Sequence, residues 1–99
     1  MQEKDIEGRL RDRLRAVGCK ALKFESPGYT GVPDRLVLIP GGRIVFVELK
    51  APGKKERPRQ RIVQKQFRDL GFTVFSSVDS YEKVEKVVTY CREAMSDGV

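Results

Sequence analysis

Apolar positions follow a helical spacing at the start of the chain and strand-like runs after it. Residues 3–17 predict a helix that ends at Gly18, because apolar residues recur three or four positions apart: Ile6, Leu10, Leu14 and Val17. Residues 19–26 predict a short strand, which a Ser-Pro-Gly turn ends. Residues 35–39 and 44–49 are near-continuous apolar runs rich in β-branched residues, and such runs are typical of central strands buried on both faces.

The second half of the chain predicts a loop, a helix, a strand and a last helix. Residues 51–57 form a charged loop, and Pro58 suits the first turn of a helix that ends at Gly71 and contains Ile62, Val63, Phe67 and Leu70. Residues 72–78 predict a fourth strand. Asp79 and Glu82 resemble a capping box that opens a helix with four inward residues, Val84, Val87, Val88 and Cys91. The order α-β-β-β-α-β-α, without a repeat or linker, predicts one α/β domain over residues 1–99.

Composition excludes several classes of protein and of site. The 99 residues are 39% apolar and 34% charged, which is ordinary for a globular protein, and no run approaches the length of a membrane span. The charged N-terminus predicts no secretory signal, so we expect a cytoplasmic protein without a membrane partner. The chain has two cysteines, Cys19 and Cys91, and no histidine. Catalysis would therefore depend on carboxylates, lysine, hydroxyls or a metal held by oxygen.

Positive charge is concentrated in one short segment. The net charge is +6, and six cations fall within residues 50–61: Lys50, Lys54, Lys55, Arg57, Arg59 and Arg61. A basic surplus favours polyanions, nucleic acid first and anionic membrane second. A basic surface that only aids solubility is the simpler interpretation of net charge alone.

Charged residues stand at the edge of the most apolar segment. Side chains alternate along a strand, so Glu48 and Lys50 share one face, and Asp34 lies on one face of the neighbouring strand. A two-residue loop at Gly41-Gly42 would set Asp34 opposite Leu49, on the wrong face. A three-residue loop that ends on a left-handed glycine would set Asp34 opposite Glu48. The Pro-Gly-Gly sequence permits the longer loop without requiring it.

In the second register, two carboxylates lie close together at the end of the hairpin. Each raises the pKa of the other unless a cation sits between them, and oxygen ligands with open positions suit Mg²⁺ or Mn²⁺. Lys50 could pair with a carboxylate, hold a phosphate oxygen or orient a water. An ordinary ion pair beside two unrelated acids is the simpler interpretation of a bare D…ExK pattern. Strand placement, the shared face and the basic run favour a site.

"PD" at residues 33–34 and "ELK" at 48–50, across a hairpin, resemble the PD-(D/E)xK nuclease superfamily. More narrowly, "GVPDRLVLIPGG", "FVELKAPG" and a downstream Pro-x-Gln at Pro58 and Gln60 resemble the VRR-NUC family of virus-type replication and repair nucleases. The resemblance runs from about Glu3 to Phe75. It implies a restriction-endonuclease-like core, with a central mixed sheet flanked by helices, and one further helix at the end.

The resemblance also implies roles for individual residues. Asp34 and Glu48 would bind the divalent metal, with the Leu49 carbonyl as a further ligand, and Lys50 would position or activate the water. Gln60 falls on the family's helix glutamine near the site. Glu7 falls on the first-helix acid that often completes the metal site, although Glu3 lies one turn away on the same face. Family helices often carry histidine at the position of Gln64.

The predicted function is that of a metal-dependent DNA endonuclease. Stand-alone members resemble phage proteins, and some act on four-way junctions as dimers, so we expect a homodimeric junction resolvase in a phage or bacterial host cytoplasm. A flap-directed or nonspecific nuclease is the main alternative. A non-catalytic DNA-binding module, or a basic interaction or toxin-like protein without metal, remains a rival. The predicted DNA contacts are Lys54, Lys55, Arg57, Arg59 and Arg61.

Overall fold

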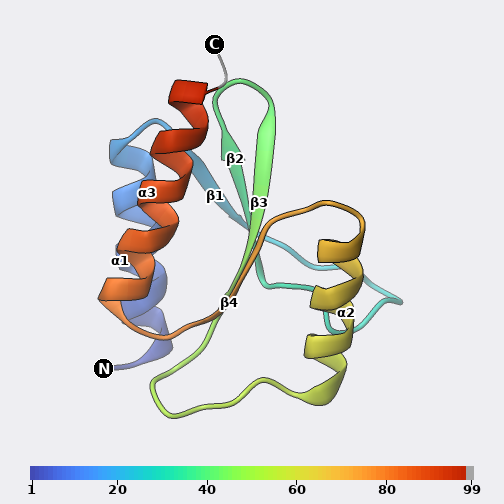
Figure 1. Cartoon of the computed structure of the whole chain (residues 1–99). Helices are drawn as coiled ribbons and strands as arrows, with labels where there is room; N and C mark the ends of the chain where they lie inside the picture. The colour runs from blue at the N-terminus through green and yellow to red at the C-terminus, as the bar shows by residue number, and fades with distance from the viewer. Residues whose placement is uncertain (98–99) are drawn as a thin grey trace.

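A computed structural model describes residues 1–97, and its helices and strands follow the predicted order (Figure 1). The elements are α1 (Glu3–Ala16), β1 (Lys20–Lys23), β2 (Arg35–Ile39), β3 (Arg43–Leu49), α2 (Pro58–Asp69), β4 (Val74–Val78) and α3 (Tyr81–Asp97). Among these residues, no helix combines the length and the apolar character that crossing a membrane requires.

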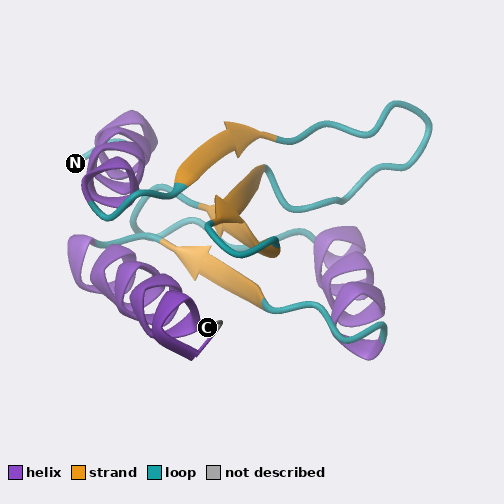
Figure 2. Cartoon of the chain, turned by 90° about the horizontal axis from the view of Figure 1, so that it is seen from above, coloured by secondary structure: helices purple, strands orange, loops and turns teal. Residues whose placement is uncertain are grey.

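The four strands form one mixed sheet in the order β1-β2-β3-β4. Strand β2 is antiparallel to both β1 and β3, whereas β4 runs parallel to β3 at the edge of the sheet. Helices α1 and α3 pack against each other on one face, and α2 lies on the other side (Figures 1 and 2). The predicted mixed sheet flanked by helices is therefore confirmed.

The β2–β3 hairpin has the three-residue loop that would set Asp34 opposite Glu48. Ile39 pairs with Arg43, which leaves a three-residue loop, residues 40–42, and this loop ends on Gly42 with φ of +85°. Arg35 pairs with Val47, and the same register, continued by one residue, sets Asp34 opposite Glu48. Of the two registers left open by the sequence, the structure has the one that brings the carboxylates together.

The main core lies between the sheet and the helices α1 and α3. The inward residues of β2 and β3 are fully covered there, and the predicted apolar faces of both helices meet them: Ile6, Leu10, Leu14, Val37, Val45, Val47, Val84, Val87, Val88 and Cys91. Burial of this set is the main stabilising contribution to the fold. The last helix therefore uses its predicted apolar face inside the molecule.

The opposite face of the sheet is covered at one end only. Phe46 packs under α2 at this end, with the rings of Phe24, Phe67 and Phe72 at 4.8–5.7 Å from its own. Toward the hairpin loop, Leu38 is 39% exposed. The prediction that β2 and β3 are buried on both faces is wrong at this end, because the 12-residue α2 does not reach it.

Three local predictions also need correction. Strand β1 covers only residues 20–23 of the predicted 19–26. The predicted second helix ends at Asp69, so Leu70 is its C-cap rather than a helical residue, and both Ile62 and Leu70 are exposed. The last helix is capped by Ser80, whose Oγ accepts the backbone N–H of Lys83 at 3.1 Å, so the predicted capping box at Asp79 and Glu82 is wrong. The carboxylate of Asp79 pairs instead with Lys83 Nζ at 3.0 Å.

Candidate active site

Asp34 and Glu48 each accept a hydrogen bond from a backbone N–H of the facing segment at the end of the hairpin. The backbone N–H of Asp34 donates to Glu48 Oε1 at 3.1 Å, and the N–H of Leu49 donates to Asp34 Oδ1 at 3.1 Å. Glu48 is almost fully buried, and Asp34 is half-buried. We call these two side chains the carboxylate pair. Their positions are set by strand register rather than by flexible loops.

Lys50 and Gln60 complete the polar contacts of Glu48. Lys50 Nζ lies 3.1 Å from Glu48 Oε2, and Gln60 Nε2 donates to the same oxygen at 3.0 Å. The Oε1 atom of Gln60 accepts the backbone N–H of Arg57 at 2.8 Å. Gln60 therefore joins the first turn of α2 to the carboxylate pair. The structure brings together four of the predicted site residues: Asp34, Glu48, Lys50 and Gln60.

A β-bulge in β4 lies beside Glu48. Val47 pairs with Phe75 but Leu49 pairs with Val78, so β4 has one extra residue at this point. Ser77, in the bulge, has φ of +49°, which is uncommon for a residue with a side chain. Beyond the bulge, the backbone N–H of Lys50 donates to the Val78 carbonyl at 3.1 Å. The bulge thus lets the regular pairing stop at Glu48 while β4 still holds Lys50.

The carboxylate pair is electrostatically costly without a cation. The pKa of Asp34 is raised to about 7, first by burial and then by the negative charges of Glu48 and Glu3, against the opposing effects of Leu49 N–H and Lys50. Burial also raises the pKa of Glu48, which Lys50 partly offsets. The sequence predicted mutual repulsion, but removal from water is the larger cause for both groups.

The donor set of this site fits Mg²⁺ or Mn²⁺. These ions prefer oxygen ligands, and Mg²⁺ usually keeps several waters beside one or two carboxylates. The two carboxylates lie beside the Leu49 backbone, which is held to Asp34 through its N–H. No group of three or more acidic, histidine or cysteine side chains suited to a metal occurs within residues 1–97. Two carboxylates and a backbone carbonyl suit an ion that keeps several of its own waters.

Arg35 separates Glu7 from the carboxylate pair. The Nη2 atom of Arg35 pairs with Glu7, and its Nη1 donates to the Asp34 carbonyl at 2.9 Å. Glu7 thus reaches Asp34 only through Arg35, and the acid of α1 whose charge acts on the pKa of Asp34 is Glu3. Sequence reasoning missed this nearly buried arginine. Its position as the first residue of an apolar strand could have revealed it, because a buried arginine needs a carboxylate partner.

Gln64 is fully buried and belongs to a different polar chain. Its Nε2 donates to Glu56 Oε2 at 2.7 Å, and its Oε1 accepts the hydroxyl of Ser76. Gln64 therefore ties the loop before α2 to β4 instead of contacting the carboxylate pair. Glu56, which it holds, is close enough for its charge to raise the pKa of Glu48.

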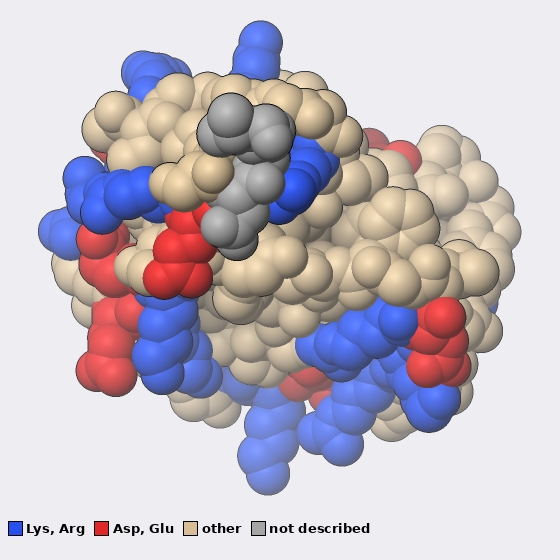
Figure 3. All heavy atoms as spheres, turned by 45° about the horizontal axis from the view of Figure 1, so that its top comes forward, with Lys and Arg blue, Asp and Glu red and all other residues tan. Residues whose placement is uncertain are grey.

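The predicted DNA-binding cations surround the first turn of α2. Residues 50–68 contain eight of the 20 Lys and Arg but only one of the 14 Asp and Glu. Lys54, Lys55, Arg57, Arg59 and Arg61 are all exposed. Figure 3 shows Lys and Arg along the lower edge of one face and also at its left side and top, around a broad area with few charged side chains. The net positive charge of the chain thus lies in the segment that also supplies Lys50 and Gln60, because cations and acids nearly balance in the other residues.

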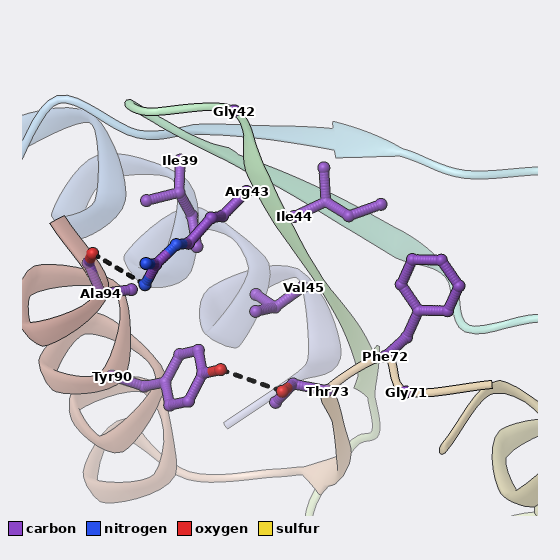
Figure 4. Close-up of a pocket in the computed structure, with 10 residues that line it drawn as sticks. All are labelled: Ile39, Gly42, Arg43, Ile44, Val45, Gly71, Phe72, Thr73, Tyr90 and Ala94. Atoms are coloured by element: carbon purple, nitrogen blue, oxygen red, sulfur yellow. Dashed lines mark hydrogen bonds between the residues drawn. The ribbon is translucent and has the colours of Figure 1, made fainter. Parts of the chain in front are cut away.

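A separate hollow of about 270 Å³ lies at the other end of β3, where β4 has not yet begun (Figure 4). Its walls include Arg43, which donates to the Ala94 carbonyl at 3.1 Å, and Tyr90, whose hydroxyl lies 2.9 Å from Thr73 Oγ1. None of its lining residues carries a carboxylate. It therefore lacks the acid groups that mark the site at Asp34.

Comparisons with known proteins agree with this geometry. No family model matches the chain. A solved structure described as "VRR_NUC domain" superimposes with a TM-score of 0.80 at 32% identity, over 89% of this chain and 95% of that one. The "Putative nuclease p44" of Acyrthosiphon pisum secondary endosymbiont phage 1 is 53% identical over 60 residues, which are 61% of this chain and 64% of that protein. The matched part thus spans less than two thirds of the phage protein.

Proposed function

The chain belongs to the VRR-NUC family, and from this membership we propose that it is a DNA endonuclease that hydrolyses phosphodiester bonds with Mg²⁺ or Mn²⁺. The observation that carries the proposal is the carboxylate pair: two acids held on opposed strands, with raised pKa values and a lysine beside them. A buried pair of this kind costs stability unless it is used to bind a cation. The phage relative whose name describes a nuclease supports the same chemistry.

In this proposal the two acids hold the metal ion, and Lys50 positions the attacking water. Asp34 and Glu48, with the Leu49 carbonyl, would hold the ion, which supplies charge neutralisation at the phosphate and a lower pKa for a bound water. Lys50 now balances the charge of Glu48 from 3.1 Å. Its ammonium has three N–H donors, so it suits a water or a phosphate oxygen beside the same carboxylate. Gln60 keeps Glu48 oriented through one amide hydrogen bond.

DNA is the proposed partner because the exposed cations adjoin the carboxylate pair. Lys54 and Lys55 precede the first turn of α2, and Arg57 donates its backbone N–H to Gln60. Contacts of this kind bind phosphates of any sequence and release counterions. A duplex backbone held by these side chains would pass beside Glu48.

We further propose a homodimer that resolves four-way junctions in a bacterial or phage-infected cytoplasm. One 99-residue chain carries one carboxylate pair, and a junction requires two matched cuts on opposed strands. A candidate dimer surface is the open end of the sheet face, where Leu22 and Leu38 are exposed and Leu36 and Ile44 are half-buried. The phage origin of the p44 relative supports this setting.

The decisive experiment compares cleavage of four labelled DNAs: linear duplex, flap, nicked duplex and four-way junction. We expect wild-type protein with Mg²⁺ or Mn²⁺ to cut the junction symmetrically, and neither EDTA-treated protein nor Glu48→Ala to cut any DNA. Glu82→Ala, which changes an exposed acid on α3, is the matched control and should be fully active. Preference for flap or linear DNA would replace the junction proposal. Tight DNA binding without cleavage under either metal would instead indicate a non-catalytic module.

A further inference from the structure

The loop between β1 and β2 is fastened to α2 by side chains that the carboxylate pair does not use. This loop, residues 24–34, extends beyond the sheet on the side of α2 (Figure 2). The Tyr29 hydroxyl donates to Gln66, and Arg59 Nε donates to the Thr30 carbonyl at 3.1 Å. The Arg59 guanidinium also lies over the Tyr29 ring, 4.9 Å from its centroid. Two hydrogen bonds and a cation–π contact thus join a surface loop to one helix.

Gly31 shows how closely the loop approaches α2. It has φ of +94°, and a Cβ atom there would come within 2.9 Å of Arg59 Cγ and 3.0 Å of the Arg59 carbonyl oxygen. Only glycine permits both this backbone conformation and this close approach. The loop backbone at Gly31 therefore packs directly against α2, and this contact helps to hold Tyr29, two residues earlier, in place.

A notch opens between this loop and the first turn of α2. It has a volume of about 380 Å³, and its walls are Thr30, Gly31, Val32, Arg57, Arg59 and Gln60. Gln60 contacts Glu48 directly, so the notch adjoins the carboxylate pair. Two arginines and no acid line it, which suits a phosphate group.

Tyr29 stands at the edge of this notch as an exposed but immobilised aromatic ring. It is 40% exposed, it lies outside the main core, and both its hydroxyl and one face of its ring already have partners on α2. A surface tyrosine with no partner would normally move among several rotamers. Holding the ring in advance removes the entropy that it would otherwise lose when a ligand binds.

We propose that Tyr29, backed by Arg59, is a stacking platform for one unpaired base of branched or single-stranded DNA, with the adjoining phosphate in the notch beside Arg57. Aromatic and guanidinium planes stack on nucleobases of any sequence. In the interior of an intact duplex each base is already stacked between its neighbours, so the platform favours DNA with a base that is unpaired or that has lost a stacking neighbour at a branch point. The proposal rests on DNA being the substrate, and it makes Tyr29 a residue that selects DNA structure.

The test measures equilibrium binding in EDTA, so that its outcome is independent of cleavage. Wild type, Tyr29→Leu, Tyr29→Phe and Tyr90→Leu are titrated with a blunt duplex and with a splayed duplex of the same sequence that has unpaired arms. We expect Tyr29→Leu to bind the splayed duplex roughly 5- to 100-fold more weakly, the scale of one stacked base, and the blunt duplex unchanged. Tyr29→Phe keeps the ring and should lose much less. Tyr90, 38% exposed on α3, is the matched control and should have no effect.

A second measurement follows the stacked base itself. With 2-aminopurine as the first unpaired base, stacking on Tyr29 should quench its fluorescence when wild-type protein binds, and Tyr29→Leu should remove the quench. The proposal is overturned if wild-type binding leaves the fluorescence unchanged, or if Tyr29→Leu weakens both DNAs equally. If the protein binds the splayed duplex and quenches the fluorescence but never cleaves DNA, the nuclease proposal is wrong and the stacking proposal for Tyr29 still holds.

Discussion

Asp34 and Glu48 lie where water reaches them poorly and each faces the other's negative charge. Two backbone N–H groups, the amide of Gln60 and the ammonium of Lys50 offset part of this cost. The pKa values of both acids nevertheless stay raised, so the compensation is incomplete. A divalent cation at this position would offset the remaining cost of the two negative charges. The effect of this cost on stability should therefore be clearest in the metal-free protein.

The first prediction at this scale concerns stability against pH in EDTA. Because the pKa of Asp34 is about 7 in the folded protein and 3.8 in its ordinary state, the folded form binds this proton more tightly. Its contribution to stability is therefore complete below about pH 4 and is lost as pH rises through 7. We expect Asp34→Asn to be more stable than wild type at pH 8 by on the order of 1–2 kcal/mol, after allowance for solvent screening, with little difference at pH 4.

Urea unfolding of both proteins at the two pH values measures this difference. Saturating Mn²⁺ at pH 8 should stabilise wild type and leave Asp34→Asn almost unchanged, since binding to the folded state alone raises its stability. If Asp34→Asn proves less stable than wild type at pH 8, the carboxylate is not held at a cost, and the metal assignment loses its physical basis.

A second prediction separates Lys50 from the two acids proposed as metal ligands. Lys50→Ala should lower the single-turnover cleavage rate by roughly 10²–10⁴-fold, the usual effect of removing a positioned proton-transfer group. Its Mn²⁺ affinity should remain, because both carboxylates are intact. The matched control is Lys65→Ala, an exposed lysine of α2 that pairs only with Asp69 among the ion pairs of residues 1–97. A fully active Lys50→Ala would reduce Lys50 to a structural partner of Glu48.

The residues of the site differ in how far the sequence could predict them. Asp34, Glu48 and Lys50 were predictable because strand alternation and one loop length fix their shared face. Glu3 and Glu7 were not separable, since a helix presents both on one face one turn apart. Their difference depends on Arg35, which comes from another element and binds Glu7. Such a tertiary contact leaves little trace in local spacing.

At the scale of elements, the central strands were the most predictable and the edge strands the least. Strands β2 and β3 carry dense β-branched runs around a glycine turn, and their predicted bounds hold to within one residue. The bulge in β4 was not predictable, because Ser76 and Ser77 alone do not distinguish a bulge from a regular strand. The bulge depends on pairing with β3 beside Glu48, which is a property of the sheet rather than of β4.

The prediction at this scale tests the loop before α2 as the path of the DNA backbone. Changing Lys54, Lys55 and Arg57 to Glu should weaken binding to DNA of any sequence. It should also make log Kd depend less steeply on log salt, by roughly one unit for each phosphate that the variant no longer neutralises. The matched control reverses Arg11, Arg15 and Lys20, exposed cations of α1 and β1. Each triple change lowers the net charge from +6 to zero.

Equal salt slopes for the two triple variants would show that only overall charge attracts DNA. A local effect confined to the loop variant would instead place phosphates beside Gln60 and the carboxylate pair. Fluorescence anisotropy over a range of KCl concentrations distinguishes the two outcomes, since net charge is the same in both proteins.

At the scale of the whole molecule, the sheet has one closed face and one partly open face. The sequence could not predict this asymmetry, because the alternating residues of β2 and β3 are apolar on both sides. It arises because α1 and α3 together cover one face, whereas α2 alone lies on the other. Leu22 and Leu38 are left exposed, and the apolar face of α3 is already buried in the core. Of the hairpin face and the apolar face of α3, only the hairpin face is therefore still open for dimerisation.

The last prediction is that this open face joins two copies of the chain. Sedimentation at micromolar concentration should give a dimer for wild type and a monomer for Leu38→Glu, because a charge would be buried there without a partner. Leu38→Glu should still bind a junction but lose paired cutting of its opposed strands. Ile62→Glu, an exposed apolar residue of α2 outside this face, is the control and should remain dimeric. If wild type stays monomeric both free and on junction DNA, one active site acts alone, and the flap-directed or nonspecific nuclease replaces the resolvase.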